Sequence, residues 1–117
     1  WEDVVRAAVY DLTARATPGF WPEVVGSWWD VGHQIDLAAV SYQQRVAWLG
    51  EAKWRNEPMN LQDLDNLQRR ARAWQGNATG WRLYYPLFSR SGFTAPLRER
   101  AAGDPDVLLF TPEDVVS

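Results

Sequence analysis

Hydrophobic residues in the first part of the chain recur first at helical spacing and then at strand spacing. Val5, Val9 and Leu12 predict a helix over residues 1–15. The segment TPGFWPE, residues 17–23, holds two prolines and a glycine and predicts a loop. Apolar runs then predict strands at residues 24–29, 34–40 and 46–54, the first two separated by a turn at residues 30–33.

The two strands at residues 34–40 and 46–54 are joined by the short polar segment SYQQR, which predicts an antiparallel hairpin. Because side chains in a strand repeat every two residues, each strand has two predicted faces. In the first strand, one face holds Ile35, Leu37 and Ala39, and the other holds Gln34, Asp36, Ala38 and Val40. In the second, one face holds Ala47, Leu49, Glu51 and Lys53.

The second half of the chain alternates helices with strands. Asn60 is a predicted N-cap for a helix over residues 61–75, and Pro86 predicts an edge position or an irregular end for a strand over residues 81–88. Thr94 caps a predicted helix that ends near residue 102; a strand at 106–110 and a short helix from Thr111 follow. This order predicts a mixed α/β domain in three layers. The buried stripe predicted for the helix at 61–75 is Leu61, Leu64, Leu67, Ala71 and Trp74.

Composition limits the class of protein. A chain of 117 residues has room for one core, so a single domain over residues 1–117 is predicted. The absence of cysteine excludes disulfides and thiolate metal sites, and we expect a cytoplasmic protein without a membrane span. Because the chain opens with Trp1 rather than Met, we also expect it to be a fragment of a longer protein.

Charge is distributed unevenly. Residues 45–100 hold ten of the 12 basic residues but only five of the 15 acidic ones. A basic surface favours a phosphate-rich ligand such as DNA, whereas the alternative is an ordinary solvated helix face. The candidate phosphate contacts are Arg55, Arg69, Arg70 and Arg72.

The sequence GEAKW, residues 50–54, places a carboxylate and an ammonium at the end of an apolar strand. Buried charge is costly unless it is paired or binds a metal. Glu51, Lys53 and the nearby Asp36 therefore form either a salt-bridged strand end or a site. Glu2 extends the apolar face of the first helix and could point into the protein, or it could merely complement the helix dipole.

The predicted helix with Glu2, the hairpin with Asp36 and the EAK sequence on the next strand together resemble the PD-(D/E)XK nuclease superfamily. Ile35 and Asp36 are followed by fourteen residues and then by Glu51, although Ile35 stands where the motif has proline. More narrowly, the segments WWDVGHQIDLAAV, LGEAKW and LFSRSGF resemble an uncharacterised nuclease-like domain at the C-terminus of archaeal-type AAA+/STAND ATPases. The resemblance implies a restriction-endonuclease-like α/β/α fold with a central mixed sheet.

The resemblance also implies a chemistry. Asp36, Glu51 and the carbonyl of Ala52 would bind Mg²⁺ or Mn²⁺, Lys53 would orient the attacking water, and Glu2 would assist. The implied function is metal-dependent hydrolysis of DNA in a module of a larger ATPase. A module that regulates that ATPase without catalysis, by DNA binding, partner binding or homodimerisation, stays open as the alternative.

Overall fold

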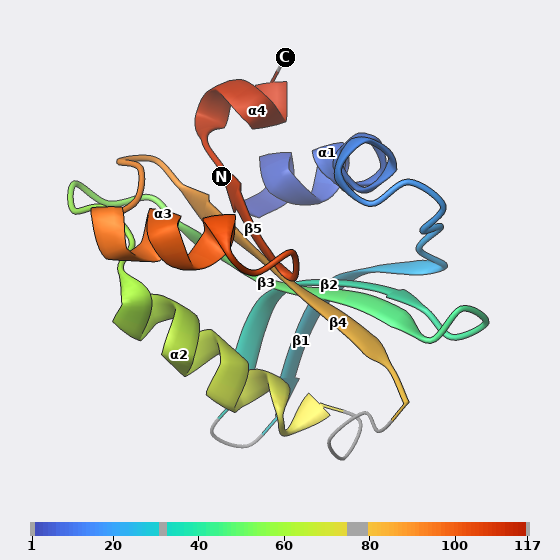
Figure 1. Cartoon of the computed structure of the whole chain (residues 1–117). Helices are drawn as coiled ribbons and strands as arrows, with labels where there is room; N and C mark the ends of the chain where they lie inside the picture. The colour runs from blue at the N-terminus through green and yellow to red at the C-terminus, as the bar shows by residue number, and fades with distance from the viewer. Residues whose placement is uncertain (1, 31–32, 75–79, 117) are drawn as a thin grey trace.

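The computed structural model describes residues 2–30, 33–74 and 80–116. Figure 1 shows helices on both sides of a central sheet. The predicted order of helices and strands is confirmed. The elements are α1 (Glu2–Ala16), β1 (Val24–Asp30), β2 (His33–Ser41), β3 (Val46–Lys53), α2 (Leu61–Ala71), β4 (Arg82–Ser89), α3 (Ala95–Ala102), β5 (Val107–Phe110) and α4 (Pro112–Val116).

The strands formed by the described residues make one sheet in the order β1-β2-β3-β4-β5. The pairs β1–β2 and β2–β3 are antiparallel, so the predicted hairpin at β2–β3 is confirmed. The pairs β3–β4 and β4–β5 are parallel, because α2 and α3 carry the chain back across the sheet. The sheet is therefore mixed, and β3 joins its antiparallel and parallel parts.

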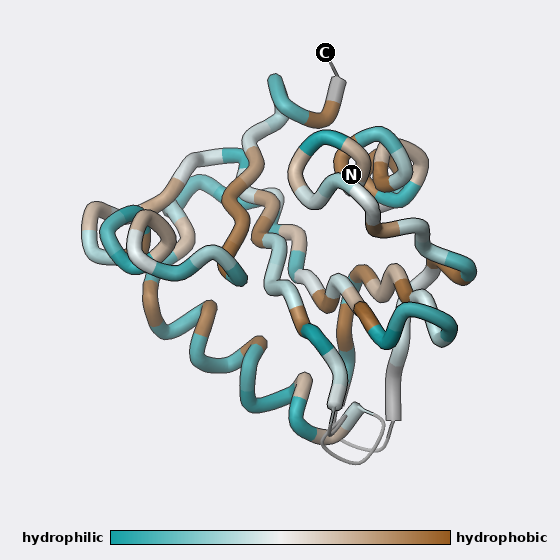
Figure 2. The backbone as a smooth tube through the Cα atoms, turned by 45° about the vertical axis from the view of Figure 1, so that its right-hand side comes forward, coloured by the Kyte–Doolittle hydropathy of each residue, from teal (hydrophilic) through white to brown (hydrophobic). Residues whose placement is uncertain are grey.

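Each face of the sheet has its own hydrophobic core. On one face, α1 and α4 cover Trp48 and Phe88, which are fully buried. On the other face, α2 and α3 cover Leu49 and Leu87. Figure 2 shows hydrophobic and hydrophilic positions alternating along α2, as an amphipathic helix over a sheet requires. The molecule thus has the predicted three layers.

The predicted faces of β2 are wrong at Ile35, because β2 contains a bulge. Gly26 pairs with Ala38 but Trp28 pairs with Ile35, so one residue of β1 faces both Asp36 and Leu37. A bulge adds a residue on one strand and shifts the alternation of side chains beyond it. Ile35 accordingly packs on the α2 face, while Leu37 packs on the α1 face.

The predicted edge position of Pro86 is also wrong. Strand β4 lies between β3 and β5, and Pro86 is buried inside it. The neighbouring residue of β3 is Gly50, where an added Cβ would lie 2.7 Å from the Cγ of Pro86. The missing side chain of Gly50 makes room for the proline ring, which explains why a central strand accepts proline here.

Helix α2 is shorter than predicted. It ends at Ala71, and the amide of Ala73 then donates to the carbonyl of Arg70, which tightens the chain into a three-residue turn. Leu61, predicted to be buried, is exposed at the first position of the helix. The capping prediction is confirmed, since the Asn60 side chain accepts from the Asp63 amide.

The helices of the described residues include none that is long and apolar enough to cross a membrane.

Candidate functional site

Asp36 lies at the bulge of β2, where the hairpin ladder with β3 stops. The last β2–β3 pair is Leu37 with Gly50, so Asp36 comes just beyond regular pairing. Its Oδ2 accepts a hydrogen bond from the Ala52 amide at 3.1 Å, and its Oδ1 accepts from Gln34 Nε2 at 3.5 Å. The bulge therefore turns the Asp36 carboxylate toward the β3 backbone between Glu51 and Lys53.

The same hydrogen bond fixes the direction of the Ala52 carbonyl. In an extended strand the amide and carbonyl of one residue point to the same edge of the strand. Since the Ala52 amide points toward the Asp36 carboxylate, the Ala52 carbonyl points toward the β2 side as well. Two kinds of oxygen able to act as a metal ligand, a carboxylate and a peptide carbonyl, thus lie along the gap between β2 and β3.

Glu51 lies on the opposite, α2-facing side of β3 from Ala52, and only 4% of it is exposed. Its Oε1 accepts from Arg70 Nη2 at 2.9 Å and lies 3.2 Å from Lys53 Nζ. The prediction that Glu51 and Lys53 share a face is confirmed. Two cations on one carboxylate oxygen offset the cost of burying the charge.

Arg70 connects α2 to both strands of the hairpin. Besides Glu51, its guanidinium donates to the Gln34 carbonyl at 3.1 Å and to the Asn66 carbonyl at 3.2 Å. Gln34 also contacts Asp36, so a continuous polar network runs from Asp36 through Gln34 and Arg70 to Glu51 and Lys53. Arg70 joins this network from the edge of the α2 stripe, one residue before the buried Ala71.

Ser89 adds a polar atom beside this network. It pairs with Lys53 across the parallel β3–β4 ladder, and paired residues of neighbouring strands point to the same face. Its Oγ is buried and has no hydrogen-bond partner within the described part of the chain. Buried hydroxyls usually have a hydrogen-bond partner, so Ser89 stands out as an unsatisfied polar group on the face of Glu51 and Lys53.

The remaining predicted residues fall into separate groups. Glu2 begins α1, but its side chain is outside the described residues. Arg55 donates to Asp63 and to the carbonyl of Pro58, so it braces the start of α2. Arg69, in the last turn of α2, and Arg72, the residue that caps its C-terminus, are exposed.

The oxygen atoms near Asp36 and Glu51 are of the kind that a divalent cation binds. Mg²⁺ binds oxygen and is usually held by one or two carboxylates together with water and substrate phosphate. Asp36, Glu51 and the Ala52 carbonyl provide oxygen donors of that kind at the ends of adjacent strands. No group of three or more His, Cys, Asp or Glu side chains suited to a metal gathers among the described residues. Oxygen ligands of this type suit a hard cation such as Mg²⁺.

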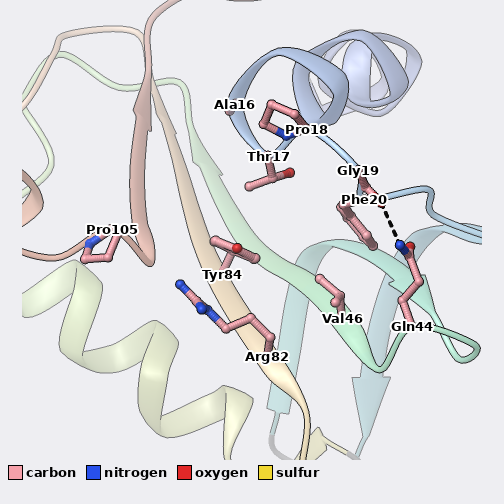
Figure 3. A pocket seen from close by; sticks show the side chains of 10 residues that line it. All are labelled: Ala16, Thr17, Pro18, Gly19, Phe20, Gln44, Val46, Arg82, Tyr84 and Pro105. Atoms are coloured by element: carbon pink, nitrogen blue, oxygen red, sulfur yellow. Dashed lines mark hydrogen bonds between the residues drawn. The ribbon is translucent and has the colours of Figure 1, made fainter.

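A cavity of about 420 Å³ lies at the other end of β3 and β4, where these strands begin. Figure 3 shows Arg82 and Tyr84 on one side of it and the 17–20 segment on the other. The Gln44 side chain donates to the Gly19 carbonyl at 2.6 Å and accepts from the Trp21 amide at 2.9 Å. This cavity is separate from the polar network, and its main charge, Arg82, is paired with Asp106.

The predicted salt-bridge alternative, Lys53 with Glu51, is present in the structure, but sequence reasoning missed Arg70 as the second partner of Glu51 and Arg90 as the partner of Trp54. Arg70 was predicted as a phosphate contact, and the only sequence signal for its contact with Glu51 is its place beside the α2 stripe. Trp54 and Arg90 meet at the ends of β3 and β4, with the guanidinium carbon 5.1 Å from the centre of a Trp54 ring. They are 36 residues apart, so only the parallel pairing of β3 and β4 brings them together.

No curated protein and no solved structure matches the chain significantly. A family model does match, over residues 1–70, and it spans α1, the three antiparallel strands and most of α2. Asp36, Glu51, Lys53 and Arg70 are all within the matched part. Because the match covers more than half of the chain, the protein belongs to DUF234, a family described as archaeal and bacterial proteins of unknown function.

Proposed function

We propose that this domain is a metal-dependent nuclease of the PD-(D/E)XK type, which hydrolyses phosphodiester bonds in DNA. The observation that carries the proposal is the contact of the Asp36 carboxylate with the Ala52 amide, directly between Glu51 and Lys53. The contact places Asp36 of β2 beside the β3 residue between Glu51 and Lys53, so the two halves of the proposed motif are neighbours. Nothing in a hairpin by itself requires a bulge there, and bulges are frequent next to active sites.

The arrangement of elements supports a restriction-endonuclease-like fold. A helix, three antiparallel strands, a crossover helix and a parallel strand follow one another, with the motif on the second and third strands. The resemblance of the sequence implies this same arrangement.

Asp36, Glu51 and the Ala52 carbonyl would hold Mg²⁺ or Mn²⁺. A bound ion of this kind supplies a water of lowered pKa and polarises a phosphoryl oxygen. Glu51 is buried and pre-positioned by Arg70, so little reorganisation is needed to present its carboxylate. Glu2 remains a proposed additional carboxylate.

Lys53 has the properties expected of the residue that orients water and contacts phosphate. Its Nζ lies 3.2 Å from Glu51 Oε1, and its side chain is 37% exposed, so it reaches both the carboxylate and solvent. Arg69 and Arg72, exposed at the C-terminal end of α2, are proposed phosphate contacts, whereas Arg55 and Arg70 would act by positioning acidic side chains.

The second candidate is a non-catalytic module that binds DNA, a second copy of the chain or an associated ATPase domain. One observation favours it: Glu51 contacts two cations in the network, as a purely structural salt bridge would. The two candidates make different predictions for cleavage.

The deciding experiment is a cleavage assay in Mg²⁺ or Mn²⁺ on supercoiled, linear, single-stranded and branched DNA. Asp36→Asn and Lys53→Ala should each lower the rate at least 100-fold, because each removes a group that acts in the transition state. Asp65→Asn, at an exposed acid on α2, is the matched control and should cut like the parent. Equal cleavage by all four proteins, or none by the parent, would support the non-catalytic module.

A further inference from the structure

We infer that Trp54 and Arg90 form a stacking platform for an unpaired nucleobase, so that the site receives single-stranded or locally unpaired DNA. The inference rests on the proposed function and specifies the substrate class of that same site. It starts from Trp54, which directly follows Lys53 and is 56% exposed. Tryptophan usually buries most of its large apolar surface, so this exposure calls for an explanation.

Arg90 holds a cation over the Trp54 ring. The guanidinium carbon lies 5.1 Å from the ring centre, within the range of a cation–π contact. More than half of the Trp54 surface remains open to solvent even with Arg90 in this position. A nucleobase stacks on such a ring, and a neighbouring phosphate pairs with such a guanidinium, so the two side chains together match one nucleotide.

Hydrogen bonds join the two loops that carry Trp54 and Arg90. The Arg90 amide donates to the Lys53 carbonyl at 3.1 Å, and the Ser91 hydroxyl donates to the Arg55 carbonyl. Farther along, the Met59 amide donates to the Gly92 carbonyl at 3.0 Å. The platform is therefore built on ordered backbone, which reduces the entropy lost when a ligand binds.

The position of the platform fits a strand that also enters the proposed catalytic site. Trp54 follows Glu51 by three positions, about 10 Å along a strand at about 3.3 Å per residue. That is about three steps at the rise of stacked bases, about 3.4 Å. A base on Trp54 would thus belong to a nucleotide close to the phosphate beside Lys53.

Stacking on Trp54 requires a base whose face is accessible. In a duplex both faces of each base are covered by neighbours, and exposing one costs a few kcal/mol. Phosphate contacts alone would not distinguish single-stranded from duplex DNA in this way. The platform therefore predicts a preference for single strands, frayed ends or junctions over blunt duplex.

The test measures binding of the whole chain to a labelled oligothymidine and to a hairpin duplex of equal length, in EDTA so that cleavage is prevented. Trp54→Ala should weaken binding of the single strand about tenfold or more and duplex binding much less. Trp54→Phe, which keeps an aromatic ring, should retain most of the affinity. Arg90→Ala should also weaken binding. It should reduce the slope of log affinity against log salt concentration by about one, the value for one lost phosphate contact.

Trp21→Ala is the matched control. Trp21 is 73% exposed, but it lies in the loop between α1 and β1, at the opposite end of β3 from Trp54. Its loss should therefore leave binding unchanged. Thermal unfolding of each variant separates lost binding from lost folding. Single-strand binding that is absent in the parent, or equal in the parent and Trp54→Ala, overturns the inference.

Comparison with cleavage separates this inference from the proposed function. If Trp54-dependent binding occurs but no protein cuts DNA, the platform stands and the nuclease proposal fails. If Asp36-dependent cleavage occurs without any effect of Trp54 on binding, the nuclease stands and the platform fails.

Discussion

Gly50 of β3 and Pro86 of β4 are neighbours across the ladder, and the missing side chain of Gly50 leaves room for the proline ring. A proline in a central strand lacks the amide that a ladder needs and brings a rigid ring. At Gly50 an added Cβ would lie 2.6 Å from the Pro86 carbonyl oxygen and 2.7 Å from its Cγ. Both distances are below those that real side chains adopt, so the backbone of one strand would have to move.

Gly50→Ala is therefore expected to destabilise the domain by about 1–3 kcal/mol, the usual cost of overpacking a tight interior. The measurement is the free energy of unfolding in urea. Gly26→Ala is the matched control, because a Cβ at Gly26 in β1 would meet no atom within 4 Å. Equal stability of both variants would show that β3 and β4 adjust without strain.

Glu51 illustrates how one residue can serve stability and chemistry together. Its burial is tolerated because Arg70 and Lys53 contact it, and the same contacts would hold a catalytic carboxylate in place. The geometry of this residue alone is compatible with both candidate functions, and it is the effect of Asp36 and Lys53 on cleavage that separates them.

The turn between β2 and β3 is organised by a carboxylate from another element. Glu23, just before β1, accepts hydrogen bonds from the Gln43 amide and from the Ser41 hydroxyl, each at 2.9 Å. The amide of Gln43, followed by the Ser41 hydroxyl, lowers the pKa of Glu23 below its ordinary value of 4.5. The charged form of Glu23 thus joins the α1–β1 loop to the hairpin turn.

A lowered folded-state pKa means that the stabilisation is present above the unfolded value of 4.5 and is lost as pH falls through the folded value. Glu23→Gln should therefore be less stable than the parent at pH 7, and the two should converge once the pH falls below the folded-state pKa of Glu23. The measurement is the urea midpoint of both proteins at each pH. A difference that stays constant with pH would mean that the charge of Glu23 contributes nothing.

The whole molecule is held together by a sheet with a separate core on each face. Leu12 of α1 belongs to the core on one face, and Leu64 of α2 belongs to the core on the other. Because every strand contributes side chains to these cores, loss of either one removes support from the same sheet.

Leu12→Ala and Leu64→Ala should each lower the free energy of unfolding by about 2–5 kcal/mol, since both residues are buried. Both should shift one cooperative transition and leave its dependence on urea unchanged. Far- and near-ultraviolet circular dichroism would follow secondary and tertiary structure separately. Two separate transitions would instead mean that the layers unfold independently.

Periodicity in the sequence predicted the helices, the strands and the shared face of Glu51 and Lys53, because repeats of 3.6 and two residues are local properties. It failed at Ile35, at Pro86 and at the end of α2. The bulge depends on how β1 pairs with β2, and the position of Pro86 depends on the gap left by Gly50. These features depend on a neighbouring strand, which no single segment encodes.

The sequence by itself determined the mixed α/β class, the order of elements and the spacing of Asp36, Glu51 and Lys53. Only the tertiary structure decided that Arg70 contacts Glu51, that the Asp36 carboxylate meets the Ala52 amide, and that Arg90 lies over Trp54. Each of these contacts joins residues 16 to 36 positions apart. Such contacts arise from strand register and helix crossover, which are set by the packing of the whole chain rather than by the pattern within any one element.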